Sequence, residues 1–231
     1  MKFIDLLKMR IKKPKFWDNE KKTILSFLLL PFSYLYLALF WINRTLKNSI
    51  SNKKTTIPVI CVGNIYIGGT GKTPLAREIY KIVKSFGKKP AFVKKYYQYL
   101  SDEINMLERT GKVYATQNRY TGIVLSASNN YNVAILDDGF QDLSINPKLS
   151  ILCFNSKQMI GNGQIIPSGP LRESLGAIQR ADCVIINGEK SLDFEKKISK
   201  FKKNKKLHIF YSNYKIKNIE KFRNKQITAF A

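Results

Sequence analysis

The sequence has one histidine, three cysteines and few acidic residues, and each shortage excludes a class of site. Because His208 is the only histidine, a histidine-based metal cluster is excluded, as is a Ser/His/Asp triad built on any other histidine. The cysteines, Cys61, Cys153 and Cys183, lie far apart in apolar runs. This spacing argues against a disulfide framework or a zinc site and predicts buried thiols in a reducing compartment.

Acidic residues number 16 against 40 lysines and arginines, which leaves a formal net charge of +24. This excess favours a polyanionic partner such as nucleic acid, an anionic membrane surface or a phosphorylated substrate. Biased codon usage, suggested by the many Lys, Asn and Ile residues, is an alternative source of the charge. Of the 231 residues 44% are hydrophobic, which excludes a wholly disordered chain and provides material for a core.

The longest uncharged run covers residues 24–42, ILSFLLLPFSYLYLALFWI. As a helix it would be about as long as a hydrocarbon core is thick. Basic residues flank it on both sides, so the positive-inside rule selects no orientation. Pro31 also allows a bent helix that lies in the interface, and a buried core helix is the remaining alternative. We expect residues 1–48 to form a basic segment with a membrane-associated helix, and residues 49–231 to form a second unit.

After residue 58, short apolar runs alternate with amphipathic ones, which is the pattern of βαβ units. The expected strands are 59–62, 91–93, 113–115, 133–136, 151–154, 184–186 and 207–210. The expected helices are 74–86, 102–109, 119–128 and 192–201. Glycines and prolines predict a loop over 161–172. The order predicts an α/β fold with a mostly parallel sheet flanked by helices.

The strongest motif is GGTGKT, which lies directly between an expected strand and an expected helix. Its residues are Gly68, Gly69, Thr70, Gly71, Lys72 and Thr73. In a phosphate loop, glycines let backbone amides turn toward phosphate oxygens, the lysine reaches the β and γ phosphates, and the threonine hydroxyl meets Mg²⁺. The strict pattern asks for glycine where this chain has Tyr66, so the match depends on GGTGKT and its setting. The motif predicts a P-loop NTPase-like fold that binds a nucleotide with Mg²⁺.

A second motif, DDGFQ, follows the apolar strand VAIL and begins with Asp137 and Asp138. A carboxylate at the end of a core strand beside a phosphate loop is where a Walker B residue holds Mg²⁺, directly or through water. We therefore predict a metal role for Asp137 and a catalytic role for Asp138. A simple Asp-Gly turn at Asp138 is the alternative.

These two motifs, together with three others, resemble the tetraacyldisaccharide 4'-kinases, the lipid A 4'-kinases. In chain order they are VGN at 62–64, GGTGKTP, DDGFQ, GNG at 161–163 and PSGPLRE at 167–173. The resemblance implies ATP-dependent phosphorylation, with Mg²⁺, of the 4'-hydroxyl of a tetraacyldisaccharide 1-phosphate, the lipid A disaccharide precursor. It implies the cytoplasmic face of the bacterial inner membrane as the location, an anionic membrane surface as a partner, and no nucleic acid.

The resemblance also implies roles for residues outside the two main motifs. The family's Gly-Asp-Glu motif matches SDE at 101–103, which makes Asp102 the candidate base for the sugar hydroxyl; a helix cap is the alternative. Arg119 is a candidate phosphate contact, with a surface arginine as the alternative. In PSGPLRE, Arg172 is a candidate substrate contact and Glu173 an indirect Mg²⁺ partner, or the two close a structural turn.

Three departures from the family pattern stand out. The family's Ser-Arg-Gly-Tyr motif is VKKY at 93–96 here, so a lysine replaces the glycine that permits close backbone approach. Asp142 stands where the family has a histidine. The chain stops within an apolar run, 227–231, before the family's later Asp-His-His segment. We therefore expect a piece of a longer protein, with weak or absent turnover.

Two other classes of protein are compatible with parts of the sequence. A MinD/ParA-like membrane-associated ATPase also combines a glycine-rich loop with membrane binding, but it prefers a lysine where this chain has Ile67. A non-enzymatic polyanion-binding protein could stack bases on the tyrosines that are interleaved with lysines over 94–99. That second alternative leaves the phosphate loop and the aspartate pair unexplained.

Overall fold

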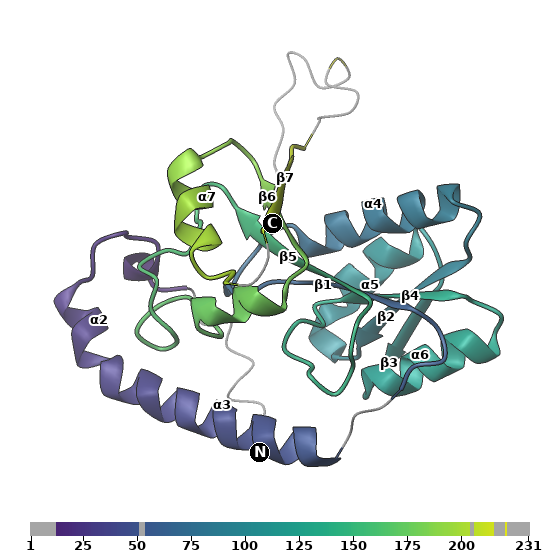
Figure 1. Cartoon of the computed structure of the whole chain (residues 1–231), viewed down its shortest axis with the longest axis horizontal. Helices are drawn as coiled ribbons and strands as arrows, with labels where there is room; N and C mark the ends of the chain where they lie inside the picture. Colours follow the sequence, from purple (N-terminus) through teal and green to yellow (C-terminus); the bar gives the residue numbers. More distant parts are fainter. Residues whose placement is uncertain (1–12, 51–53, 204–205, 215–219, 221–231) are drawn as a thin grey trace.

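The computed structural model describes residues 13–50, 54–203, 206–214 and 220 (Figure 1). Seven strands form one sheet in the order β3-β2-β4-β1-β5-β6-β7, and each neighbouring pair is parallel. The strands are β1 Val59–Gly63, β2 Pro90–Lys95, β3 Val113–Thr116, β4 Val133–Asp137, β5 Leu149–Asn155, β6 Cys183–Asn187 and β7 His208–Ser212. The expected parallel sheet is confirmed, and β1 lies at its centre.

Helices cover both faces of this sheet. They are α4 Lys72–Ser85, α5 Ser101–Glu108, α6 Arg119–Ser128 and α7 Leu192–Ser199, with short 3-10 turns η1 Lys15–Trp17, η2 Gln98–Leu100 and η3 Leu175–Arg180. Caps fix two of the starts, because the side chains of Asn118 and Ser191 accept bonds from backbone amides in the first turns of α6 and α7. The four helices expected after residue 58 are therefore present.

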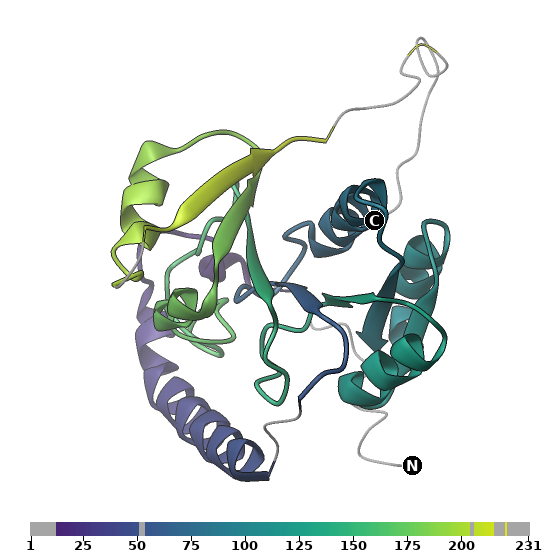
Figure 2. The ribbon, with the colours of Figure 1, turned by 45° about the vertical axis from the view of Figure 1, so that its right-hand side comes forward.

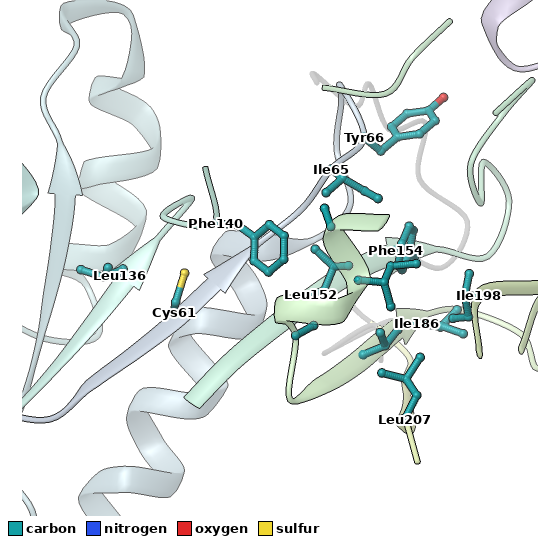
Figure 3. Packing of buried hydrophobic residues seen from close by; sticks show 14 of the residues in the cluster. Cys61, Ile65, Tyr66, Leu136, Phe140, Leu152, Phe154, Ile186, Ile198 and Leu207 are labelled. Atoms are coloured by element: carbon teal, nitrogen blue, oxygen red, sulfur yellow. The ribbon is translucent and has the colours of Figure 1, made fainter. Parts of the chain in front are cut away.

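Two apolar cores fill the space between the sheet and its helices. One lies under α4 and α5, where Leu75, Tyr80 and Leu107 pack against Phe92 and Ile135 of the sheet. Figure 3 shows part of the other core, in which Leu152 and Phe154 of β5 lie near Ile186 of β6 and Ile198 of α7. Packing on both faces holds the carboxyl ends of the strands, where the phosphate loop begins, in a fixed arrangement.

The apolar N-terminal run forms two consecutive helices, α2 Ile24–Leu28 and α3 Leu30–Ile50. The chain turns at Leu29, and Pro31 falls in the first turn of α3, where a missing backbone donor is tolerated. Figure 2 shows α3 as a long helix that runs along the outside of the sheet and its flanking helices. No helix in the described part of the chain has the length and hydrophobicity needed to span a bilayer. Helix α3 also continues past the unit boundary expected at residue 48.

Other sequence expectations differ in outcome. Cys61 and Cys153 are buried as expected, whereas Cys183 is only half-buried because β6 leaves its first residue near the surface. His208 is exposed at the start of β7. The loop over 161–172 is confirmed as irregular, apart from single-residue bridges at Ile165 and Leu171. Residues 227–231, in which the chain ends, lie outside the described residues.

Candidate functional site

The GGTGKT segment lies after β1, includes the first two residues of α4, and adopts a conformation that requires glycine. Gly68 and Gly71 have φ angles of 132° and 81°. A Cβ atom on Gly71 would lie 2.4 Å from Nδ2 of Asn187, so that position has no room for a side chain. Asn64 closes the loop by donating from Nδ2 to Thr70 Oγ1 at 2.9 Å. The loop thus presents its amides at the N-terminus of a long helix, as anion binding needs.

Tyr66, which departs from the strict loop pattern, anchors the N-terminal segment. Its side chain is fully buried, its hydroxyl donates to Asp18, and Lys13 Nζ donates to the same hydroxyl at 2.8 Å. Burial and the Asp18 carboxylate together raise the pKa of Tyr66 above its usual value. A glycine could not make these contacts, so the departure replaces loop flexibility with a fixed attachment for residues 13–18.

Asp137 lies at the end of β4 and meets the loop directly. Thr73 Oγ1 donates to Asp137 Oδ2 at 3.1 Å, and Lys94 Nζ donates to the same oxygen at 2.5 Å. Asp137 is fully buried, and this burial raises the pKa of its carboxyl group against the opposing attraction of Lys94. The structure therefore brings together two of the residues to which the sequence analysis assigns a metal role, Thr73 and Asp137.

Thr73 and Asp137 provide oxygen atoms of the kind that Mg²⁺ binds. Oδ1 of Asp137 is buried and has no hydrogen-bond partner among the described residues. Mg²⁺ takes one or two protein oxygens and fills its remaining positions with water and phosphate, so a hydroxyl beside a carboxylate is a sufficient protein contribution. The described residues contain no group of three His, Cys, Asp or Glu side chains that could hold a metal.

Asp138 faces the positive groups of the site. Its backbone is left-handed, with φ 61°, a conformation that Asp adopts more readily than most residues. Lys72 Nζ lies 3.8 Å from its Oδ1, and Arg172 donates from Nη1 to both carboxylate oxygens at 3.2 Å. Burial alone would raise the pKa of Asp138, but the charges of Lys72 and Arg172 outweigh it and lower that pKa.

Arg119 also reaches this group of charges, from the first residue of α6. It donates to the carbonyl oxygen of Asp138 at 2.6 Å and to Oδ2 of Asp142 at 3.1 Å. Asp142 is further held by the Ser144 hydroxyl at 2.6 Å. Burial disfavours the ionised Asp142, but Ser144 and Arg119 outweigh it and lower its pKa. Asp142 thus fixes the guanidinium of Arg119 beside the loop.

A cavity of about 1190 Å³ opens over these residues. The phosphate loop, Asp138, Arg119 and Arg172 line it, with Tyr36 and Phe40 of α3 contributing apolar surface. Tyr36 also donates from its hydroxyl to the carbonyl oxygen of Arg172 at 3.2 Å. Helix α3 is therefore part of the wall of the site.

Two predicted site residues lie elsewhere. Asp102 is exposed in the first turn of α5 and is absent from the described lining of the cavity, whereas its neighbour Glu103 lines it. Glu173 is buried outside the lining, where it accepts from Arg180 at 2.8 Å and from Gln141 at 3.1 Å. The roles of Asp102 as base and Glu173 as metal partner stay predictions.

Sequence reasoning missed Lys94 and Glu103 as site residues, and it noted Asp142 only as a departure. Glu103 Oε2 lies 2.6 Å from Lys94 Nζ, which also bonds Asp137. The available signal was the position of Lys94 at the end of an expected core strand. A lysine is rarely buried there without an acidic partner.

Comparison with known proteins gives consistent matches. The family model described as Tetraacyldisaccharide-1-P 4'-kinase matches residues 25–231. A tetraacyldisaccharide 4'-kinase from Pelagibacter ubique is 44% identical over 185 residues, covering 80% of this chain and 58% of that protein. One from Rhodopseudomonas palustris strain BisB5 is 32% identical, covering 78% and 57%.

A solved structure is similar as well. The crystal structure of LpxK from Aquifex aeolicus in complex with ATP has a TM-score of 0.64 and 27% identity, and the match covers 81% of this chain and 64% of that one. The chain thus spans a little over half the length of these curated relatives.

Proposed function

The chain belongs to the tetraacyldisaccharide-1-P 4'-kinase family, and from that premise we propose that it transfers the γ-phosphoryl group of ATP to the 4'-hydroxyl of a tetraacyldisaccharide 1-phosphate. In this reaction the hydroxyl oxygen bonds to the γ-phosphorus, the bond to the β-phosphate oxygen breaks, and ADP leaves. The observation that carries the proposal is the convergence of Lys72, Thr73, Asp137, Asp138 and Arg172 at the N-terminus of α4.

The positive groups of the site supply what phosphoryl transfer mainly requires, positioning and neutralisation of charge. The loop amides and Lys72 bind the β and γ phosphates, and Arg119 and Arg172 lie close enough to the same cavity to contact phosphate oxygens. Thr73 and Asp137 would hold Mg²⁺, with Glu173 as an indirect partner. The metal, when bound, neutralises charge that develops on the transferred group.

The acceptor hydroxyl must lose a proton, and we propose Asp102 as the group that accepts it. In this structure the carboxylate of Asp102 lies outside the cavity lining, so the proposal requires the first turn of α5 to turn toward the acceptor. Asp138 assists by holding Lys72 and Arg172 in place. The lowered pKa of Asp138 makes its carboxylate a weak base, so it is poorly suited to act as the general base.

The acceptor carries fatty chains, and we propose that α2 and α3 bind the surface of an anionic membrane, at the cytoplasmic face of the inner membrane. Polar contacts attach α3 to the loop over 161–172, with Ser33 Oγ donating to Ile165 O at 2.9 Å and Tyr36 donating to the carbonyl oxygen of Arg172. Large apolar side chains remain on its outer side. They include Phe32, Tyr34, Leu35, Leu39, Trp41 and Ile42.

This apolar surface supports interfacial binding for two reasons. Contiguous exposed apolar side chains on a helix indicate a membrane or protein contact, and the excess of lysine favours anionic lipid. Because Tyr36 and Phe40 of the same helix line the cavity, a lipid held there has its sugar headgroup near the phosphate loop. We propose no nucleic-acid partner, since the family relationship leaves that alternative without support.

A transfer assay tests the function. The purified chain is mixed with γ-labelled ATP, Mg²⁺ and tetraacyldisaccharide 1-phosphate in anionic vesicles, and labelled lipid is measured against a Lys72→Ala control. The proposal expects acceptor-dependent label that the control lacks, at a low rate because the chain departs from the family pattern at 93–96 and at Asp142. Hydrolysis of ATP without acceptor phosphorylation would favour a MinD/ParA-like ATPase instead. Salt-sensitive binding to nucleic acid without affinity for ATP would favour the polyanion-binding alternative.

A further inference from the structure

Lys94 is a buried lysine held between two carboxylates from different elements. It lies at the end of β2, is 2% exposed, and donates from Nζ to Asp137 Oδ2 at 2.5 Å and to Glu103 Oε2 at 2.6 Å. Strands β2 and β4 are neighbours with Val93 opposite Leu136, so residues 94 and 137 meet at the same edge of the sheet. Burial alone would lower the pKa of Lys94, but Asp137 and Glu103 outweigh it and raise that pKa. The ammonium thus forms a buried ion pair with Asp137 and a second ion pair with the half-exposed Glu103.

This charge lies against the carboxylate that the proposed function assigns to Mg²⁺. Oδ2 of Asp137 accepts from both Thr73 and Lys94, and only Oδ1 lacks a partner among the described residues. Two positive charges a few ångströms apart repel strongly where solvent is excluded. A divalent cation on Asp137 would thus compete with the Lys94 ammonium for the same carboxylate.

Glu103 provides the ammonium with another partner. Its side chain is 47% exposed and lines the cavity, so it can change its conformation more easily than the fully buried Asp137 side chain. Lys94 can therefore lose its contact with Asp137 without becoming an unpaired buried charge, which is strongly unfavourable. The same contact joins α5 to the end of β2.

We propose that Lys94 is a positioning residue that neutralises Asp137 while nucleotide is absent and releases that carboxylate to Mg²⁺ when nucleotide binds, keeping its contact with Glu103. Lys94 acts through Asp137 and touches no substrate. The inference depends on the proposed function, because it requires metal-dependent nucleotide binding at Thr73 and Asp137. Its distinctive consequence is that Lys94 and Mg²⁺ oppose each other in binding.

The first test is the substitution Lys94→Met, which keeps most of the length of the side chain and removes its charge. Affinity for a fluorescent ATP analogue is measured with excess Mg²⁺ and with EDTA, and the ratio of the two affinities is the readout. The ratio should rise at least about tenfold over wild type, or about 1.4 kcal/mol of coupling, because Mg²⁺ no longer displaces an ammonium. Lys89→Met, an exposed lysine just before β2, should keep the wild-type ratio.

An unchanged or smaller ratio in Lys94→Met would overturn the inference, since a merely structural lysine would lower both affinities equally. Wild-type protein that binds the analogue in neither condition would overturn the proposed function as well. If wild type binds the analogue and the ratio of its affinities with Mg²⁺ and with EDTA equals that of the variant, only this inference is overturned.

A second variant covers the case in which Lys94→Met does not fold. Glu103→Gln removes a half-exposed carboxylate and leaves the buried pair of Lys94 and Asp137 intact. Because the ammonium then lacks its alternative partner, it stays on Asp137, and the metal-dependent ratio should fall by a factor of about three, or about 0.7 kcal/mol. Glu108→Gln on the same helix is the matched control, since its side chain is exposed. A ratio that rises or stays constant in Glu103→Gln would overturn the inference.

Discussion

Removing Arg180 should destabilise the fold strongly, because it would leave the carboxylate of Glu173 buried without its ionic partner. Arg180 donates to both oxygens of Glu173, at 3.0 and 2.8 Å, and its guanidinium lies 4.7 Å from the centre of the Phe140 ring. Breaking a buried pair by removing one partner costs about 3–5 kcal/mol. Because the Arg180 side chain is 26% exposed, we take the lower end, about 3 kcal/mol.

Differential scanning calorimetry would measure this loss in an Arg180→Met variant, which keeps part of the packing on Phe140. For a chain of this size, 3 kcal/mol corresponds to a fall in Tm of about 6–12 °C. The double variant Arg180→Met with Glu173→Gln should recover about 1–2 kcal/mol, because it leaves no unpaired charge. A fall in Tm below about 2 °C for Arg180→Met would refute the reasoning. It would also favour the metal role for Glu173 over the structural one.

Three further predictions concern the site and the membrane. Asp102→Asn should lower turnover at least about tenfold more than it lowers ATP affinity, because removing a general base affects the chemical step. Equal losses of turnover, measured by kinetics, and of ATP affinity, measured by calorimetry, would make Asp102 structural. The ionised Asp138 should contribute stability that is fully present above its unfolded pKa of about 3.9 and is lost as the pH falls through the lowered folded pKa, and Asp138→Asn should remove this contribution. The difference in unfolding free energy between wild type and variant, measured in urea, should therefore shrink as the pH falls. A difference that stays constant between about pH 3 and pH 6 would contradict this. Trp41→Glu, at a residue 62% exposed on α3, should weaken binding to anionic vesicles at least about tenfold in sedimentation, whereas Phe86→Glu, 75% exposed at the end of α4, should not.

Local patterns were sufficient to predict the elements that form the nucleotide site. The apolar runs at 59–62 and 133–136, which precede GGTGKT and Asp137, each indicate a strand. In the structure both strands end at the same edge of the sheet. The pairing of Thr73 with Asp137 follows from this geometry, because parallel neighbours bring their carboxyl ends together.

The sequence could not decide which carboxylate of α5 enters the cavity. Adjacent residues on a helix point about 100° apart, so the choice between Asp102 and Glu103 depends on the rotation of the helix. The burial of Ile104 and Leu107 sets that rotation, and it turns Glu103 inward. Lys94 was missed for a related reason, since its partner Asp137 lies on a neighbouring strand and strand order is a long-range property. The position of Lys94 on an expected core strand signals an acidic partner, but nothing near it in the sequence identifies that partner as Asp137.

The central claim is that the GGTGKT loop and Lys72 bind the phosphates of ATP together with Mg²⁺. Isothermal titration calorimetry of the purified chain with ATP, in the presence and absence of Mg²⁺, tests it most directly, with Lys72→Ala as the control. The account predicts metal-dependent binding by the wild type and at least about tenfold weaker binding by the variant, because a charge-assisted contact to phosphate is lost. Equal affinity of Lys72→Ala and wild type, or the absence of binding by wild type with Mg²⁺, would contradict it.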